Sequence, residues 1–213
     1  IPKKIDKNKI LELKKFILLK KTIVIASSHQ KEEYLILKKI NEIVNSNKNI
    51  LLIIVPRHPN RSQEVLNIAK KFISKSCLES EYNIMPDSKC LISNSLGEMD
   101  AYYNLSDIVI LGGSFINMGG HNPIEPAKYN CCILTGPSIH NWQNIFEEMI
   151  YNDACVLCNS NLELRNNIEQ LLRNDKIRKR LMGNALKYSN GNQTIIEDII
   201  KNIDPFLKNI KNA

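Results

Sequence analysis

Four short stretches of this 213-residue sequence combine glycine, imidazole, hydroxyl and guanidinium groups where apolar runs stop or a helix is expected to begin. They are Ser27-Ser28-His29, Pro56-Arg57-His58-Pro59, Gly112-Gly113-Ser114 and Gly119-Gly120-His121-Asn122. In an open parallel sheet, ligands bind beyond the carboxyl ends of the strands, where the loops lead into helices. The four stretches therefore predict one site at one edge of a sheet.

Each stretch offers groups that suit an anionic nucleotide. Paired glycines let backbone N–H groups approach a phosphate without a Cβ in the way. Arg57 supplies a fixed, two-pronged cation for a phosphate or a carboxylate. Asn122 followed by Pro123 is typical of a helix start, whose positive end favours anions. Glu125 lies on the first turn of that helix, where a carboxylate can accept both hydroxyls of a ribose.

Taken singly, these residues also suit structural roles. A glycine pair after a strand is commonly a turn, and Asn122 is commonly only a cap. His58 also suits an exposed loop, and both Glu125 and the pair Glu32-Glu33 also suit a helix N-terminus. Their order and spacing together favour a binding site.

The elements expected around these loops alternate between continuous apolar runs and segments of helical periodicity. This pattern predicts an α/β fold, a Rossmann-like parallel sheet with helices on both faces. Strands are expected at 22–26, 50–55, near 82–85, 89–92, 107–111, 131–134 and 154–157. Helices are expected at 31–45, 61–74, 97–104, from 122 onward, 141–150 and 161–203. We divide the chain into a linker with a short helix (1–21), a ligand-binding core (22–160) and C-terminal helices of the same domain (161–213).

Composition limits the classes of partner. The formal net charge of +7 suits nucleic acid, an anionic membrane surface or a phosphorylated ligand, but no basic segment interleaved with aromatic residues points to nucleic acid. No apolar run reaches the ~18 residues of a membrane span, and the lysine-rich start is not typical of a signal peptide. Cys131-Cys132 and the pair Cys155 and Cys158 lie in apolar runs, so we expect buried, reduced thiols and no metal site.

The longest motif is Gly119-Gly120-His121-Asn122-Pro123-Ile124-Glu125-Pro126-Ala127. With Gly112-Gly113-Ser114, it resembles the signature of bacterial 3-deoxy-D-manno-octulosonic acid (Kdo) transferases. The supporting matches are Ala26-Ser27-Ser28-His29 with Glu32-Glu33, Val55-Pro56-Arg57-His58-Pro59, Gly97-Glu98-Met99 with Tyr102-Tyr103, and Gly136-Pro137 followed by Asn141-Trp142. The resemblance covers about residues 23–148. Lys31 stands where a small glycine is expected, and Asn94 where an acidic residue is expected.

The resemblance implies the C-terminal half of a GT-B glycosyltransferase, in which two Rossmann-like domains face each other across a cleft. The C-terminal domain would bind the donor CMP-Kdo, and the missing N-terminal domain would hold the lipid A precursor and the catalytic base. The family works at the cytoplasmic face of the bacterial inner membrane in lipopolysaccharide biosynthesis, with no metal ion or other cofactor. We therefore expect a soluble fragment that binds CMP, contacts no nucleic acid and transfers no Kdo alone.

The resemblance also implies which residues bind the substrate. They are Ser28, Arg57, His58, Gly97, Glu98, Gly112, Gly113, Ser114, Gly119, Gly120, His121, Asn122 and Glu125. Backbone N–H groups of 112–114 and the helix start near Asn122 are expected to meet the CMP phosphate. Arg57 is expected to add to that stabilisation or to hold the cytosine side of the nucleotide, and Asn122 and Glu125 to bind the ribose.

Three alternatives remain at this point. The donor domain of another GT-B enzyme that uses a UDP-sugar would share the sheet, the glycine loops and the ribose-binding glutamate, so a preference for cytosine over uracil separates the two. A basic nucleic-acid-binding module predicts steeply salt-dependent binding. A purely structural domain would not need four loops marked by glycine or proline at one sheet edge.

Overall fold

The computed structural model describes residues 17, 20–81, 85 and 87–191, and within them a seven-stranded sheet. The strand order is β3-β4-β2-β1-β5-β6-β7, and every neighbouring pair is parallel. The strands are β1 (Lys21–Ser28), β2 (Ile50–Pro56), β3 (Ser76–Leu78), β4 (Cys90–Ile92), β5 (Ile108–Leu111), β6 (Cys132–Thr135) and β7 (Val156–Leu157). The predicted parallel α/β sheet is confirmed.

Helices connect these strands along the chain. They are α2 (Glu32–Ser46), α3 (Ser62–Lys70), α4 (Met99–Leu105), α5 (Ile124–Lys128), α6 (Gln143–Tyr151) and α7 (Asn161–Arg173), with 3-10 turns η1 (Pro59–Arg61), η2 (Glu79–Glu81) and η3 (His140–Trp142). Residues 175–191 form a further helical stretch. The helix expected near the N-terminus lies outside the described residues except for Ile17, as does everything after residue 191.

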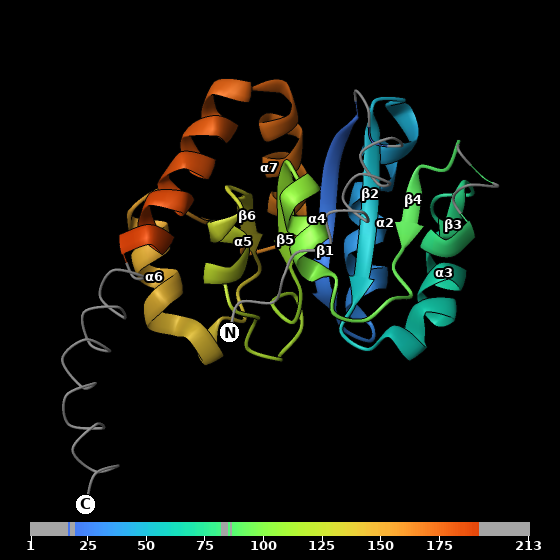
Figure 1. Ribbon diagram of the computed structural model, residues 1–213, viewed down its shortest axis with the longest axis horizontal. Coiled ribbons are helices and arrows are strands. Elements are labelled where there is room, and N and C mark those ends of the chain that lie inside the picture. The colour runs from blue at the N-terminus through green and yellow to red at the C-terminus, as the bar shows by residue number, and fades with distance from the viewer. Residues whose placement is uncertain (1–16, 18–19, 82–84, 86, 192–213) are drawn as a thin grey trace, which may run out of the picture.

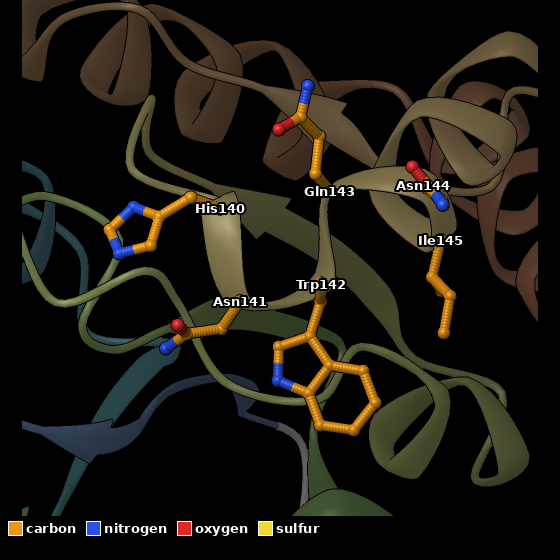
Figure 2. Close-up of a pocket in the computed structure, with 6 residues that line it drawn as sticks. All are labelled: His140, Asn141, Trp142, Gln143, Asn144 and Ile145. Atoms are coloured by element: carbon orange, nitrogen blue, oxygen red, sulfur yellow. The ribbon is translucent and has the colours of Figure 1, made fainter.

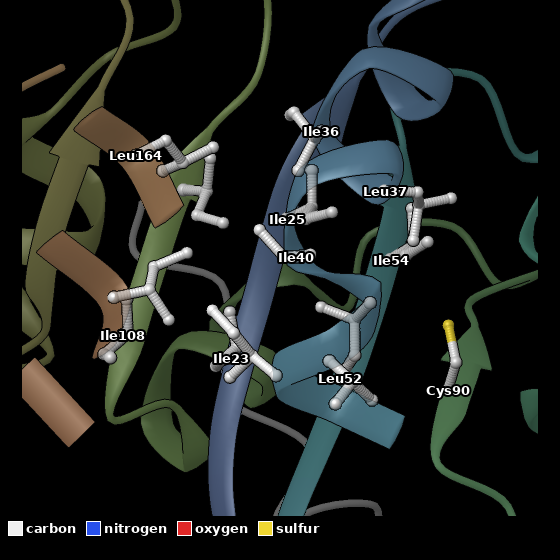
Figure 3. Close-up of a cluster of buried hydrophobic side chains, with 14 of the residues drawn as sticks. Ile23, Ile25, Ile36, Leu37, Ile40, Leu52, Ile54, Cys90, Ile108 and Leu164 are labelled. Carbon is white, nitrogen blue, oxygen red and sulfur yellow. The ribbon is translucent and has the colours of Figure 1, made fainter. Parts of the chain in front are cut away.

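The helices cover both faces of the sheet (Figure 1). One apolar cluster joins the sheet to α2, α3 and α7, and a second joins it to α4, α5 and α6. Ile25 of β1 belongs to the first cluster and Val24 to the second, because successive side chains of a strand point to opposite faces. Figure 3 shows the first cluster, in which Ile36 and Ile40 of α2 lie against β1. Burial on both faces explains why the strands read as continuous apolar runs.

The sheet reverses its winding between β1 and β5. The chain passes from β1 to β2 on one side, and β5 lies on the other side of β1. The loops that leave these two strands at their carboxyl ends diverge, and such a switch point is where open α/β sheets bind ligands. Gly112 follows β5 so closely that an added Cβ would lie 2.3 Å from the carbonyl oxygen of Ser27. Glycine is needed here because two backbones meet.

The region between β2 and β4 differs from the prediction in one helix and one strand. The helix expected at 61–74 is divided into η1 and α3 and ends at Lys70, and strand β3, which follows it, was not predicted. Three residues that begin with a serine carry little apolar signal, which explains the omission. The strand expected near 82–85 lies outside the described residues except for Met85, which is not in a strand.

All six cysteines are free and buried, three in each apolar cluster, so their predicted role as small packing residues is confirmed. Burial raises the pKa of Cys158 to about 11 and that of Cys132 to about 12, which keeps both thiols protonated at neutral pH. Among the described residues, no helix combines the length and the hydropathy that crossing a bilayer requires.

The close approach of β5 to β1 predicts a large effect of one methyl group. Gly112→Ala should lower the free energy of unfolding by about 2–3 kcal/mol, because the Cβ would overlap the backbone of residue 27. Gly183→Ala is the matched control, since Gly183 is helical and a Cβ there meets nothing within 4 Å. The control should raise the free energy of unfolding by about 0.5–1 kcal/mol. Urea unfolding followed by circular dichroism measures both changes, and two variants of equal stability would refute the steric argument.

Candidate functional site

A pocket of about 240 Å³ opens at the carboxyl edge of the sheet. The lining includes Ser27 at the end of β1, Arg57 after β2, the segment before α4 with Gly97 and Glu98, and Glu125 of α5. These segments are far apart in the sequence and meet because the strands run parallel. Four of the residues predicted to bind substrate therefore share one pocket.

The pocket combines one cation with two carboxylates. Partial burial raises the pKa of Glu125, the negative charge of Asp100 adds to the rise, and the positive charges of Lys128 and Arg57 oppose it. Glu98 accepts a hydrogen bond from the Ser95 hydroxyl. An arginine suits a phosphate, and carboxylates suit hydroxyl donors, so the lining can contact both the charge and the sugar of a nucleotide.

A buried network of hydroxyl groups joins α4 to the neighbouring segments of the pocket. The Tyr102 hydroxyl donates to the Glu79 carboxylate, and the Ser93 Oγ lies 2.7 Å from it, where the serine hydroxyl can donate to the tyrosine oxygen. Tyr102 is buried and lines the pocket, so this network supports the segment that carries Gly97 and Glu98.

A buried carboxylate holds the glycine loop after β5. Glu32, at the start of α2, is fully buried and accepts hydrogen bonds from the N–H groups of Gly113 at 2.8 Å, Phe115 at 3.0 Å and His29 at 3.2 Å. Burial raises the pKa of Glu32, and the three N–H groups oppose this rise because they favour the charged form. Glu32 thus ties the loop after β1 to the loop after β5.

This arrangement differs from the expectation that N–H groups of 112–114 meet a phosphate. The Gly112 N–H donates to the Ala26 carbonyl at 2.8 Å, and the Gly113 N–H donates to Glu32. The Ser114 hydroxyl is buried and donates to the Leu111 carbonyl at 2.6 Å. Since a backbone N–H is a single donor, the N–H groups of Gly112 and Gly113 serve the fold, and Arg57 becomes the main candidate for a phosphate.

Glu33 holds a second loop. It is fully buried, accepts a hydrogen bond from Ser28 Oγ at 3.0 Å, and receives both Nη groups of Arg61, at 2.9 and 3.4 Å. Arg61 closes η1, directly after the segment that carries Arg57 and His58. Ser28, predicted to bind substrate, therefore faces this internal network, and His58 is exposed and does not line the pocket.

Two histidines meet beside the glycine loop. The Nε2 atoms of His29 and His121 are 2.8 Å apart, and their rings are nearly parallel at 9°. In such a contact one nitrogen donates and the other accepts, so at least one ring is neutral. Burial lowers the pKa of His121 to about 4, with the nearby charges of His29 and Arg57 adding to the effect.

The second glycine pair links the loops to each other. Gly119 and Gly120 have φ of +81° and +71°, which glycine adopts without strain. The Gly119 N–H donates to Ser138 Oγ at 2.9 Å and the Gly120 N–H to the Gly113 carbonyl at 3.1 Å. Asn122 Oδ1 accepts from the Ile124 N–H at 2.9 Å, but the N-cap of α5 is Pro123 and not Asn122 as predicted, and α5 is only five residues long. The predicted contribution of a helix dipole is therefore small.

A second, wider pocket of about 400 Å³ lies at the start of α6, lined by consecutive residues from His140 to Ile145 (Figure 2). Asn141 lies between this pocket and the glycine pair. Its amide donates to the Met118 carbonyl at 2.9 Å, and a Cβ at Gly119 would lie 2.5 Å from it. The Asn141-Trp142 motif therefore supports the glycine pair. Figure 2 shows Trp142 and Gln143 pointing in opposite directions.

Lys31 and Asn94 are the two residues that depart from the pattern of the resembled family, and the structure shows the conformation of one and the contact of the other. Lys31 has φ of +73°, the left-handed region that a glycine favours, so the lysine keeps a glycine-like backbone directly before α2. The Asn94 amide donates to Ser80 Oγ at 3.0 Å, outside the pocket lining. Neither residue interrupts the links made by Glu32 and Glu33.

The sequence pattern does not indicate the roles of Glu32, Glu33 and Arg61. Two glutamates after a loop also suit a helix N-terminus, and Arg61 lies outside the motifs of the resemblance. Within the described part of the chain, no three His, Cys, Asp or Glu side chains gather where they could hold a metal ion. Donor binding without a metal stays a prediction.

Comparison with known proteins points to one family. No family model matches the sequence. A 3-deoxy-D-manno-octulosonic acid transferase of Haemophilus influenzae is 30% identical over 87% of this chain and 44% of its own length. The enzyme of the same description from Rickettsia typhi is 28% identical over 95% of this chain and 44% of its own length. The chain thus spans a little under half the length of these relatives.

Comparison with solved structures gives a result consistent with these relatives. The crystal structure of the C-terminal CMP-Kdo binding domain of WaaA from Acinetobacter baumannii matches with a TM-score of 0.78 and 28% identity, over 85% of this chain and 96% of that domain. WaaG, a glycosyltransferase involved in lipopolysaccharide biosynthesis, matches with a TM-score of 0.61 at 13% identity over 89% of this chain and 47% of its own, which supports the fold alone. The sheet is that of a GT-B glycosyltransferase C-terminal domain.

The three N–H bonds to Glu32 predict that its amide analogue is poorly tolerated. Glu32→Gln leaves one acceptor oxygen and places an NH₂ group against a backbone donor, so the free energy of unfolding should fall by about 2–3 kcal/mol. Amide exchange at Gly113 and Phe115 should also accelerate. Glu147→Gln, on the exposed side of α6, is the control and should change stability by less than about 0.5 kcal/mol. Wild-type stability of Glu32→Gln would show that the carboxylate is not required.

The lowered pKa of His121 predicts a loss of stability in acid. The imidazole of the unfolded chain binds a proton near the ordinary histidine pKa of 6.5, whereas the folded one does so at about 4, so the unfolded state binds more protons between these values. The free energy of unfolding should therefore fall as pH drops from 6.5 to 4, by about 1–2 kcal/mol after allowance for partial exposure of the ring. His121→Gln should remove this part of the pH dependence, and His140→Gln, at an exposed site, should not. A His121 proton resonance that titrates near pH 6.5 would contradict the argument.

Proposed function

Because this chain is homologous to Kdo transferases and matches one CMP-Kdo binding domain along nearly the whole of that domain, we propose that it binds the donor CMP-Kdo within a glycosyltransferase of lipopolysaccharide biosynthesis. The observation that carries the proposal is the pocket at the carboxyl edge, which Arg57 lines from the segment after β2 and Glu125 from α5. This is the place at which open α/β sheets bind nucleotides.

Arg57 binds the CMP phosphate in this proposal. Cleavage of the bond between Kdo and CMP leaves additional negative charge on that phosphate, and a guanidinium fixed beside it stabilises the charge as it develops. The Glu33–Arg61 pair holds the neighbouring turn η1 and so positions Arg57. Neutral His29 and His121 border the same loops and supply hydrogen-bonding groups without a second fixed charge.

The ribose lies at Glu125 in this proposal. A carboxylate accepts hydrogen bonds from both ribose hydroxyls, and Asn122 lies three residues before Glu125, with its Oδ1 bound to the Ile124 N–H. Gly97 and Glu98, which line the same pocket, are assigned to the base or to the Kdo unit. Gly112, Gly113, Ser114, Gly119 and Gly120 keep the loops close together rather than meeting the phosphate.

The remaining steps belong to parts of the enzyme outside this chain. We assign the catalytic base and the site of the lipid A precursor to the N-terminal domain, and the membrane surface contact to the full-length enzyme at the cytoplasmic face of the inner membrane. No metal ion takes part in the proposed transfer. The UDP-sugar alternative is not favoured, because the relatives named here are Kdo transferases.

Isothermal calorimetry of this chain with CMP and UMP tests donor recognition. We expect CMP to bind measurably more tightly than UMP, and we expect no transfer of Kdo from CMP-Kdo to a lipid acceptor by this chain alone. Turnover by the chain alone would contradict the assignment of the base to another domain. A preference for UMP would support the alternative donor.

Substitutions in the pocket test the residue assignments. Arg57→Ala and Glu125→Ala should each weaken CMP binding about tenfold or more, because each removes a charge-assisted hydrogen-bonding group from the ligand. Both side chains reach the surface, so the circular dichroism spectrum should stay unchanged. Glu147→Ala is the control carboxylate and should bind CMP as the wild type does. Unchanged affinity of Glu125→Ala would remove Glu125 from the site.

A further inference from the structure

Four adjacent strands each begin just after a lysine. Lys20 precedes β1, Lys48 lies two residues before β2, Lys75 precedes β3 and Lys89 precedes β4. The strands β3, β4, β2 and β1 are neighbours in the sheet and run parallel, so their starts lie along one edge. In Figure 1 the arrows of β1 and β2 point to the bottom, so the edge where the strands begin lies at the top. The pocket lined by Arg57 and Glu125, the donor pocket, lies at the other edge, where the strands end.

The four lysines line one pocket of about 520 Å³, the lysine pocket. Asp87 is the one acidic residue among its described lining, so four ammonium groups face one carboxylate and leave a formal excess of three positive charges. Lys21, one position along the chain, behaves differently, because its ammonium is bound to Asp175 at 2.7 Å and to the Leu172 carbonyl at 2.8 Å. The excess charge is thus particular to the lysines that face the pocket.

Within the described part of the chain, none of the salt bridges involves Lys20, Lys48 or Lys75. Lys48 and Lys75 are exposed and Lys20 is half-buried. Their positive charges remain available to a ligand, and their mutual repulsion is relieved when an anion enters.

Lys89 forms the fixed wall of the lysine pocket. Its ammonium donates to the Val44 carbonyl at 3.2 Å and to the Asn45 carbonyl, at the C-terminal end of α2. An ammonium has three donors, so one remains for a ligand. Burial lowers the pKa of Lys89, and the charges of Lys75, Lys48 and Lys20 lower it further, which shows that these groups act on the same space.

From this placement we infer that the lysine pocket binds a phosphorylated anion, a phosphate mono- or diester carried by a small solute or by a lipid headgroup. A phosphate offers several oxygens to the ammonium groups at once, and lysines bind phosphate as point charges. No aromatic side chain is among the described lining, so the pocket lacks the stacking surface of a single-stranded nucleic-acid site. The site is separate from the donor pocket because it lies at the other edge of the sheet.

Inorganic pyrophosphate is the probe, titrated into the ¹⁵N-labelled chain and followed by amide chemical shifts. We expect shifts around Asn45, Lys75 and Lys89, separate from any shifts at Gly113 and His121 in the donor region. The test variant is Lys48→Gln with Lys75→Gln, at two exposed positions, and the control is Lys38→Gln with Lys179→Gln, which removes the same charge elsewhere. Affinity at the lysine pocket should fall about tenfold or more in the test variant and less than about twofold in the control.

Shifts confined to the donor region would overturn the inference, as would an equal loss of affinity in both double variants. Sedimentation with vesicles then identifies the source of the phosphate. If phosphatidylglycerol vesicles bind the wild type but not the Lys48/Lys75 variant, and phosphatidylcholine vesicles bind neither, the ligand is a headgroup. If neither kind of vesicle binds the wild type while pyrophosphate does, the ligand is a free solute. CMP affinity at the donor pocket should be the same in all variants, so failure here leaves the proposed function untouched.

Discussion

Two adjacent carboxylates, buried side by side at the start of α2, hold the functional edge of this protein together. Burying a charge is costly unless it is paired and hydrogen-bonded, and both charges are compensated here. Glu32 receives three backbone N–H groups, and Glu33 receives an arginine and a hydroxyl. Between them they fix the loops after β1 and β5 and the turn η1. These links hold the segments beside the pocket, whose lining comes from the ends of β1 and β2, the segment before α4, and the helices α4 and α5.

This internal use of hydrogen bonds changes the view of the glycine motifs. Gly112 lets β5 end against the backbone of β1, and the Gly120 N–H joins the second glycine pair to the carbonyl of Gly113. Glu32 already accepts hydrogen bonds from the N–H groups of Gly113 and Phe115, and its own negative charge disfavours a phosphate in the same position. The anion of a nucleotide is therefore better placed at Arg57, whereas the glycines keep the surrounding loops compact.

The sheet, its parallel direction and the meeting of Arg57 with Glu125 could be predicted from the sequence, because buried strands read as apolar runs and the carboxyl ends of parallel strands converge. The role of Glu32 could not, because two of the three N–H groups from which it accepts lie 81 and 83 residues away. Two glutamates after a loop look the same in the sequence whether they face solvent or a buried backbone. Strand β3 could not be predicted for a different reason. Three residues that pair only with β4 owe their conformation to that neighbour and not to their own sequence.

A crystal structure of this chain with CMP tests the account most directly. We predict that the phosphate lies against Arg57, the ribose against Glu125, and that Glu32 still accepts the N–H groups of Gly113 and Phe115. A phosphate bound to the Gly113 N–H with Glu32 displaced, or a nucleotide outside this pocket, would contradict the account.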